Sequence, residues 1–142
     1  MKKSIILAST SPFRQQLLSK IKLPFNCVSP EVDETPLINE NAEQLVRRLA
    51  IAKAQAVSDH TKEALIIGGD QVAVIDGVII GKPHNFDNAF KQLSAASGKI
   101  VTFYTGLCLL NNEKNSHQAI VELFNVHFRE LTDTMITNYL HA

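Results

Sequence analysis

Two glycines and an aspartate directly follow a short apolar run within residues 65–72. The run itself, 65–67, is rich in β-branched residues, which predicts a buried strand. Gly68 and Gly69 lack side chains, so another group can approach the backbone there. We then expect Asp70 at the end of a rigid strand with open space beside it, where a carboxylate can bind a hard metal cation or accept a proton from water. The alternative is a bulge whose acid only hydrogen-bonds a turn.

The composition is typical of one globular domain. The chain has 142 residues, of which 45% are hydrophobic, and this is long enough to bury a core. Fourteen basic residues balance fourteen acidic ones, so no overall field favours a nucleic acid polymer or an acidic membrane surface. Cys27 and Cys108 form no CxxC pair, and no apolar stretch approaches transmembrane length. We therefore expect a cytoplasmic protein that binds neither nucleic acid polymers nor membranes.

The first part of the chain predicts a strand followed by a capped helix. Residues 4–8 are expected to form the strand, and the helix runs to residue 20 with Ser11 as a good N-cap and Pro12 as a good first helical residue. Three further elements are expected after it: a strand over 23–28, an acidic loop with two prolines over 29–41, and the clearest helix over 42–58.

A hairpin dominates the prediction for the middle of the chain. A strand, a turn at Asp76-Gly77 and a second strand are expected within 64–81. The remaining elements are a helix over 86–96, strands over 100–110 and 119–129 joined by the polar loop 111–116, and a last helix capped by Thr132. This order predicts a single α/β domain over 1–142, with a mixed sheet flanked by helices.

Ser9, Ser11 and Arg14 lie at the first strand-to-helix turn. A helix N-terminus presents free N–H groups and the positive end of its dipole, so it favours a phosphate group. The two hydroxyls add donors, and Arg14 can reach back one turn as a charged fork. The alternative is an ordinary capped helix with a solvated arginine.

Lys53 lies on the apolar side of the expected helix 42–58. At 100° per residue, one stripe gathers Ala42, Val46, Leu49, Ala50 and Val57, and Lys53 lies near its centre. An unpaired buried charge is costly, so this lysine must either extend its ammonium into water or meet an anion.

The hairpin and the acidic loop add further candidates. A two-residue turn pairs Ile75 with Val78, and this register sets Gln71 opposite Lys82, about 5 Å away at the backbone. Strict alternation places Asp70 and Gln71 on opposite faces, so a bulge or a strand end is needed for both to serve one pocket. The acidic stretch 31–34 can supply a second carboxylate for a divalent metal. The alternatives are a solvated lysine and solvated acids.

Several short motifs in this order resemble those of the Maf family of nucleoside triphosphate pyrophosphatases. They are residues 7–14, 31–36, 69–72, 81–83, 97–98, 101–102 and 105–106, and the similarity extends to about Tyr139. Phe13 and Gln71 occupy the specificity positions of the branch that acts on 7-methyl-GTP, where Phe13 replaces a frequent tryptophan. The resemblance also implies that 1–142 lacks the C-terminal portion of a family member.

The resemblance implies a Maf/ITPase-like fold and an enzyme of nucleotide-pool house-cleaning. Such an enzyme cuts a (modified) nucleoside triphosphate between its α- and β-phosphates, giving a monophosphate and pyrophosphate. It uses a divalent metal cation, Mg²⁺ or Mn²⁺, acts on a small-molecule nucleotide, works in the cytoplasm and can form a homodimer. The alternative is a non-catalytic nucleotide-binding or interaction protein, because the C-terminal part of the pocket is missing.

The resemblance also assigns roles to individual positions of this sequence. Asp70 matches the general base, and Glu34 matches an acid of the metal site beside Asp70. The phosphate-contacting groups match Ser9, Arg14, Lys53 and Lys82, and the nearby Ser11 adds a hydroxyl. Phe13 is expected to stack on the positively charged methylated base with a cation–π contribution of roughly 0.5–2 kcal/mol.

Overall fold

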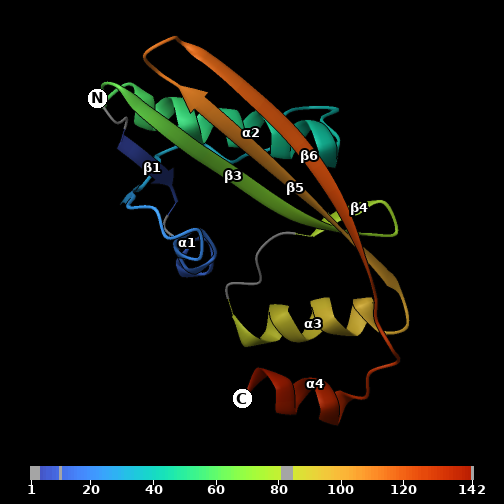
Figure 1. The fold of residues 1–142 in the computed structure, drawn as a ribbon. Helices are drawn as coiled ribbons and strands as arrows, with labels where there is room; N and C mark the ends of the chain where they lie inside the picture. The colour runs from blue at the N-terminus through green and yellow to red at the C-terminus, as the bar shows by residue number, and fades with distance from the viewer. Residues whose placement is uncertain (1–3, 10, 81–84, 142) are drawn as a thin grey trace. The chain divides into compact units, whose positions relative to one another are not determined.

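The computed structural model describes residues 4–9, 11–80 and 85–141 (Figure 1). The elements are, in chain order, β1 (Ser4–Ala8), α1 (Pro12–Ser19), β2 (Asn26–Val28), α2 (Ala42–Ser58), β3 (Ala64–Ile75), β4 (Val78–Ile80), α3 (Phe86–Ala96), β5 (Ile100–Asn111), β6 (Ser116–His127) and α4 (Asp133–Leu140). Among the described residues, no helix is both long and apolar enough to cross a membrane.

The strands form one mixed sheet in the order β2-β1-β3-β5-β6, with β4 paired to β3. β1 runs parallel to both β2 and β3, whereas β3 and β4 are antiparallel. The predicted α/β class with a mixed sheet and helices is confirmed. In the β1–β3 register Ala8 lies opposite Gly68, and this is the last pair. Ser9 and Gly69 therefore follow the ends of the same parallel pair, about 5 Å apart across the strands.

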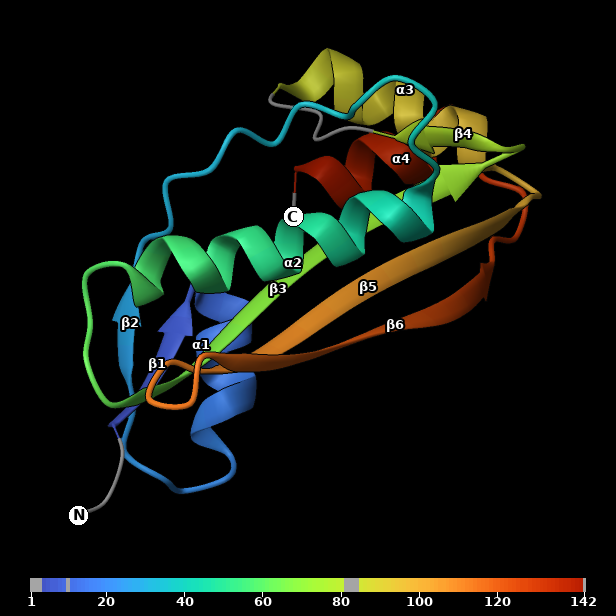
Figure 2. The same ribbon diagram turned by 90° about the horizontal axis from the view of Figure 1, so that it is seen from above.

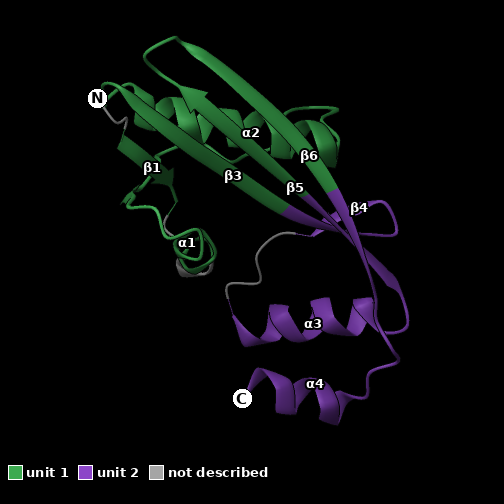
Figure 3. Ribbon diagram, in the orientation of Figure 1, with its two compact units in different colours: residues 1–71, 105–122 green, residues 72–104, 123–142 purple. Residues whose placement is uncertain are grey.

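The chain divides into two compact units (Figure 3). The first unit comprises residues 1–71 and 105–122, and the second comprises 72–104 and 123–142. The expectation of a single domain stays a prediction. In the second unit, Ile75, Ala96 and Val101 form a small core, and α3 packs beside α4.

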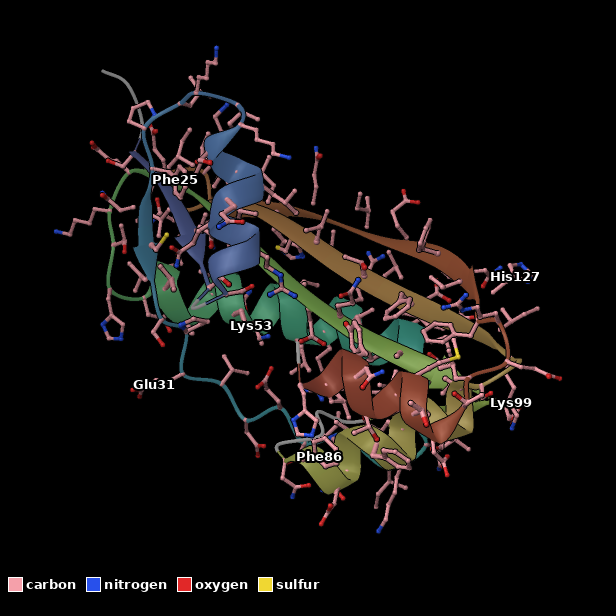
Figure 4. The ribbon with its side chains drawn as sticks, turned by 90° about the horizontal axis from the view of Figure 1, so that it is seen from below. Phe25, Glu31, Lys53, Phe86, Lys99 and His127 are labelled. Carbon is pink, nitrogen blue, oxygen red and sulfur yellow. The ribbon has the colours of Figure 1, made fainter. Side chains whose placement is uncertain are left out.

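The core of the first unit lies between α2 and the sheet. Its buried members are Ile6, Ala8, Ala50, Ala54, Val57, Ala64, Ile66, Cys108 and Leu110. Figures 2 and 4 show α2 on one face of these strands and α1 on the other. The long helix begins at a capping box, in which the side chains of Asn41 and Gln44 each accept a hydrogen bond from the other residue's backbone N–H.

Two glycines allow α2 to lie directly on the sheet. A Cβ added at Gly68 would lie 2.2 Å from the carbonyl oxygen of Ala50, and one at Gly106 would lie 2.3 Å from that of Val46. The expectation that another group can approach the backbone at Gly68 is therefore confirmed, and that group is α2. Gly69 is different, since the nearest atoms to an added Cβ are 3.5 Å away.

The predicted hairpin is confirmed. Asp76 and Gly77 have φ values of 52° and 80°, as a type I′ turn requires, and Ile75 pairs with Val78. Several strand bounds differ from the prediction. β3 runs through Asp70 to Ile75, so Asp70 lies within this strand and not at its end, and β6 ends at His127 and not at residue 129. β2 begins only at Asn26, after Pro24, whose nitrogen has no hydrogen to donate. β6 begins earlier, at Ser116, because the turn before it is complete at Asn115, which has a φ of 51°.

Candidate active site

Lys53 joins two carboxylates that come from different parts of the chain. Its Nζ lies 2.9 Å from Oδ1 of Asp70 on β3 and 2.9 Å from Oε1 of Glu34, which precedes α2. The side chains of Lys53 and Asp70 are only 12% and 9% exposed, whereas that of Glu34 is 51% exposed. The attraction between these opposite charges offsets the free energy that each charge loses when it is removed from water. Of the two alternatives for this lysine, the structure therefore has the one in which it meets an anion.

Arg14 approaches the same point from the other face of the sheet. Its Nη1 donates a hydrogen bond of 3.0 Å to the carbonyl oxygen of Gly69, and Nζ of Lys53 lies 3.4 Å from that oxygen. Gly69 lies one residue beyond the last β1–β3 pair and directly precedes Asp70. Two cations and two carboxylates thus come together at the carboxyl end of β1, and Figure 4 labels Lys53 there.

The turn between β1 and α1 is built by its two serines. The buried Ser9 accepts a hydrogen bond of 2.9 Å at Oγ from the backbone N–H of Ser11. Oγ of Ser11 in turn accepts one of 3.3 Å from the N–H of Arg14, so the predicted N-cap is confirmed. Because Oγ of Ser9 already accepts a hydrogen bond, its own proton can be donated to a ligand oxygen.

Gln71 lies on the face of β3 opposite to Asp70, as strict alternation predicts. Its side chain is exposed, and Nε2 donates a hydrogen bond of 2.9 Å to Oγ1 of Thr105 on β5. Lys82 and the side chain of Phe13 lie outside the described part of the structure, so their roles stay predictions.

Arg48 ties the acidic loop to α2. Its Nε and Nη2 donate hydrogen bonds of 2.7 and 2.9 Å to the two carboxylate oxygens of Glu40, and Nη2 also lies 3.2 Å from the carbonyl oxygen of Thr35. Glu40 additionally accepts a hydrogen bond of 3.0 Å from the N–H of Leu37. The hydrogen bond from Arg48 lowers the pKa of the Glu40 carboxyl and raises that of the guanidinium. Hydrogen bonds from Thr35 lower the pKa of Asp33 in the same loop.

Comparison with known proteins gives the family. Residues 4–142 match the family model described as "Maf: Maf-like protein". The chain belongs to the Maf family. The resemblance carried by the short motifs is thereby confirmed.

Three Maf relatives carry the same name, 7-methyl-GTP pyrophosphatase. The protein of Colwellia psychrerythraea is 56% identical over 140 residues, which cover 99% of this chain and 70% of the relative. That of Pseudomonas savastanoi pv. phaseolicola is 52% identical over 98% of this chain and 72% of the relative. That of Vibrio vulnificus is 52% identical over 96% of this chain and 70% of the relative.

The carboxylates of this Maf chain fit a divalent cation. Lys53 holds Oδ1 of Asp70, but the buried Oδ2 has no hydrogen-bond partner among the described residues. A buried carboxylate oxygen without a partner is costly, and it is the kind of ligand that Mg²⁺ takes. The described residues contain no group of three or more histidines, cysteines or acids that could hold a metal alone. Mg²⁺ needs only one or two protein carboxylates, because water and substrate phosphates complete its coordination.

Sequence reasoning missed Thr105 and the Arg48–Glu40 pair. Thr105 stands in one of the Maf-like motifs, so a pairing of β3 with β5 would have found it as a neighbour of Gln71. Glu40 and Arg48 gave no such signal, because one lies in a loop and the other is one of two adjacent arginines on α2. Only the folded path of the loop brings the two together.

Proposed function

We propose that this chain hydrolyses 7-methyl-GTP between its α- and β-phosphates, giving 7-methyl-GMP and pyrophosphate. The observation that carries the proposal is the Asp70 carboxylate beside the guanidinium of Arg14: Lys53 anchors one of its oxygens, and the other has no hydrogen-bond partner within residues 4–9, 11–80 and 85–141. The names of three relatives at 52–56% identity support the same substrate and reaction.

Arg14, Lys53 and Ser9 are proposed to bind the phosphates. Phosphoryl transfer spreads negative charge over the phosphate oxygens and the leaving group, and fixed cations stabilise that charge. Arg14 suits this task because its guanidinium can bind two oxygens in one plane. Ser11 shapes the turn that presents the Ser9 hydroxyl, and Lys82 is assigned a further phosphate contact.

Asp70 is proposed to be the general base. Lys53 fixes the carboxylate in place, so that the carboxylate can orient a water molecule and take its proton. The water oxygen forms the new bond to the α-phosphorus, and the bond between the α-phosphorus and the oxygen that bridges to the β-phosphate breaks. Pyrophosphate leaves with the electron pair of the broken bond.

Glu34 and Asp70 are proposed to hold a divalent cation, Mg²⁺ or Mn²⁺, when nucleotide is bound. Such a cation neutralises charge on the phosphate oxygens and supports their alignment. Lys53 keeps the two carboxylates apart and in place through its contacts of 2.9 Å to each.

Phe13 and Gln71 are proposed to recognise the base. The 7-methylguanine ring carries a positive charge, so stacking on the face of Phe13 gains roughly 0.5–2 kcal/mol. The amide of Gln71 is held by Thr105 and is exposed, as a group that reads a base edge must be. A cytoplasmic location and a homodimer stay predictions.

Product analysis tests the proposed reaction. The purified chain is incubated with 7-methyl-GTP and Mg²⁺ or Mn²⁺, and pyrophosphate, inorganic phosphate and nucleotide are each quantified. We expect equal amounts of pyrophosphate and 7-methyl-GMP, and slower turnover of GTP. Binding of a non-hydrolysable analogue without any pyrophosphate release would favour the alternative of a non-catalytic nucleotide-binding protein.

A further inference from the structure

We propose that Arg48 and Glu40 are a positioning pair that holds Glu34 beside Lys53 and so sets the affinity of the site for its divalent cation. This inference rests on the proposed function, because it concerns the cation that the nucleotide site takes up. Neither residue is expected to touch the substrate.

The acidic loop needs such an anchor because it has no strand or helix of its own. Residues 29–41, which Figure 4 marks by the label at Glu31, form neither a helix nor a strand. The half-exposed Glu34 side chain is therefore held by side-chain contacts such as its ion pair with Lys53, and not by a strand or helix of its own. A carboxylate on an unanchored segment must be ordered when it binds a cation, and that ordering weakens the binding.

The anchor begins at the residue that directly follows Glu34. Arg48 reaches the carbonyl oxygen of Thr35 and binds both carboxylate oxygens of Glu40, so one guanidinium fastens the two ends of the segment 35–40. The Glu40 side chain is only 7% exposed, which makes this bidentate pair stronger than an ordinary surface ion pair.

One helix carries both attachment points. Arg48 and Lys53 lie on α2, so the backbone next to Glu34 and the carboxylate of Glu34 are held by the same rigid element. Gly68 and Gly106 in turn seat that helix against β3 and β5. Release of Arg48 should therefore free Glu34 without moving Lys53 or Asp70.

Three single variants separate positioning from simple charge. R48M removes a positive charge and E40Q removes a negative one, so a purely electrostatic effect on cation affinity would have opposite signs in the two variants. A positioning role predicts weaker binding in both. R47M is the matched control, because Arg47 is the exposed neighbouring arginine on α2 and its loss changes the charge as R48M does.

The readout is Mn²⁺ binding, measured by electron paramagnetic resonance with a non-hydrolysable analogue of 7-methyl-GTP bound. We expect R48M and E40Q each to raise the Mn²⁺ dissociation constant about tenfold, the usual size for a residue that orients a metal ligand. The double variant should be no weaker than either single variant, and R47M should stay within about twofold. Amide hydrogen exchange at Thr35 and Leu37 should be faster than in wild type in R48M and E40Q, but not in R47M.

Opposite shifts in R48M and E40Q, or unchanged Mn²⁺ affinity in both, would overturn the inference, as would a wild-type chain that binds no Mn²⁺ with the analogue. If R48M does not fold, R48K takes its place, because it keeps the positive charge but cannot form the bidentate pair with Glu40. Weaker Mn²⁺ binding and faster exchange at Thr35 and Leu37 in R48K would support positioning, and unchanged values would overturn it. Because the readout needs no turnover, absent pyrophosphate release would contradict the proposed function while the Mn²⁺ result still judges this pair.

Discussion

The ammonium of Lys53 on α2 lies 2.9 Å from a carboxylate oxygen of Asp70 on β3, and both side chains are almost fully buried. Removal of one charge leaves the other uncompensated, which typically costs about 3–5 kcal/mol. Lys53 has a second partner in Glu34, whereas the other oxygen of Asp70 has none among the described residues. The two residues should therefore respond unequally to substitution.

We expect K53M to lower the free energy of unfolding by about 3 kcal/mol, because it leaves the Asp70 carboxylate buried and unpaired. D70N should cost less, since Lys53 keeps Glu34. The double variant K53M/D70N should be more stable than K53M alone. Urea unfolding of the three variants measures these differences, and a D70N variant less stable than K53M would contradict the described pairing.

Substitution of the adjacent glycines Gly68 and Gly69 should have opposite outcomes. A methyl group at Gly68 meets the backbone of α2 at 2.2 Å, and no side-chain rotation can relieve that contact. G68A should therefore lose about 3 kcal/mol of stability or fail to fold. G69A should be neutral or slightly stabilising, because its nearest neighbours are 3.5 Å away and alanine restricts the unfolded chain. Thermal unfolding of G68A and G69A measures the two changes in stability. Equal changes in the two variants would contradict the close packing of α2 on β3 at Gly68.

The acidic loop should make stability depend on pH below the ordinary carboxyl range. Arg48 lowers the pKa of Glu40 in the folded protein, while the unfolded chain keeps a value of about 4.3. The contribution of this pair is therefore present above about pH 4.3 and is lost as the pH falls through the lower folded pKa. E40Q should be less stable than wild type at pH 7 and lose less stability between pH 5 and pH 3.

Urea unfolding at a series of pH values provides that comparison. The pH dependence of the free energy of unfolding should be weaker in E40Q than in wild type. It should not vanish, because Asp33 also has a lowered pKa in the folded loop. Identical pH dependence in wild type and E40Q would show that Glu40 does not contribute.

Loss of the Thr105 hydroxyl should reduce base selectivity without unfolding the protein. In T105V the amide of Gln71 loses its hydrogen-bond acceptor. One such hydrogen bond contributes at most about tenfold to the binding of the base. We expect the ratio of kcat/KM for 7-methyl-GTP over GTP to fall by up to about tenfold. T102V is the matched control, because Thr102 also lies on β5 and bonds an amide side chain, that of Asn125. An equal change of the ratio in T102V would contradict the role of Thr105.

Local signals predicted much of this chain. The cap at Ser11 and the turn at Asp76-Gly77 each depend on neighbouring residues, so the sequence alone identifies them. A similar argument left Lys53 two alternatives, an ammonium extended into water or one that meets an anion, and did not identify Asp70 or Glu34 as its partner. These predictions needed no knowledge of how distant elements pack.

Features that arise from packing could not be predicted in this way. Gly68 indicated that some group approaches the backbone there, but the residues alone do not tell that this group is α2. Arg48 and Glu40 meet only because the loop folds back along the helix, and Thr105 meets Gln71 only because β3 and β5 are neighbours.

Single-turnover release of pyrophosphate from 7-methyl-GTP by D70N, beside wild type, tests the assignment of Asp70 as the base most directly. We expect the rate to fall by about a thousandfold, while calorimetry with a non-hydrolysable analogue finds nucleotide affinity within a few-fold of wild type. Circular dichroism confirms that the variant is folded. Pyrophosphate release by folded D70N within about tenfold of the wild-type rate would contradict the account.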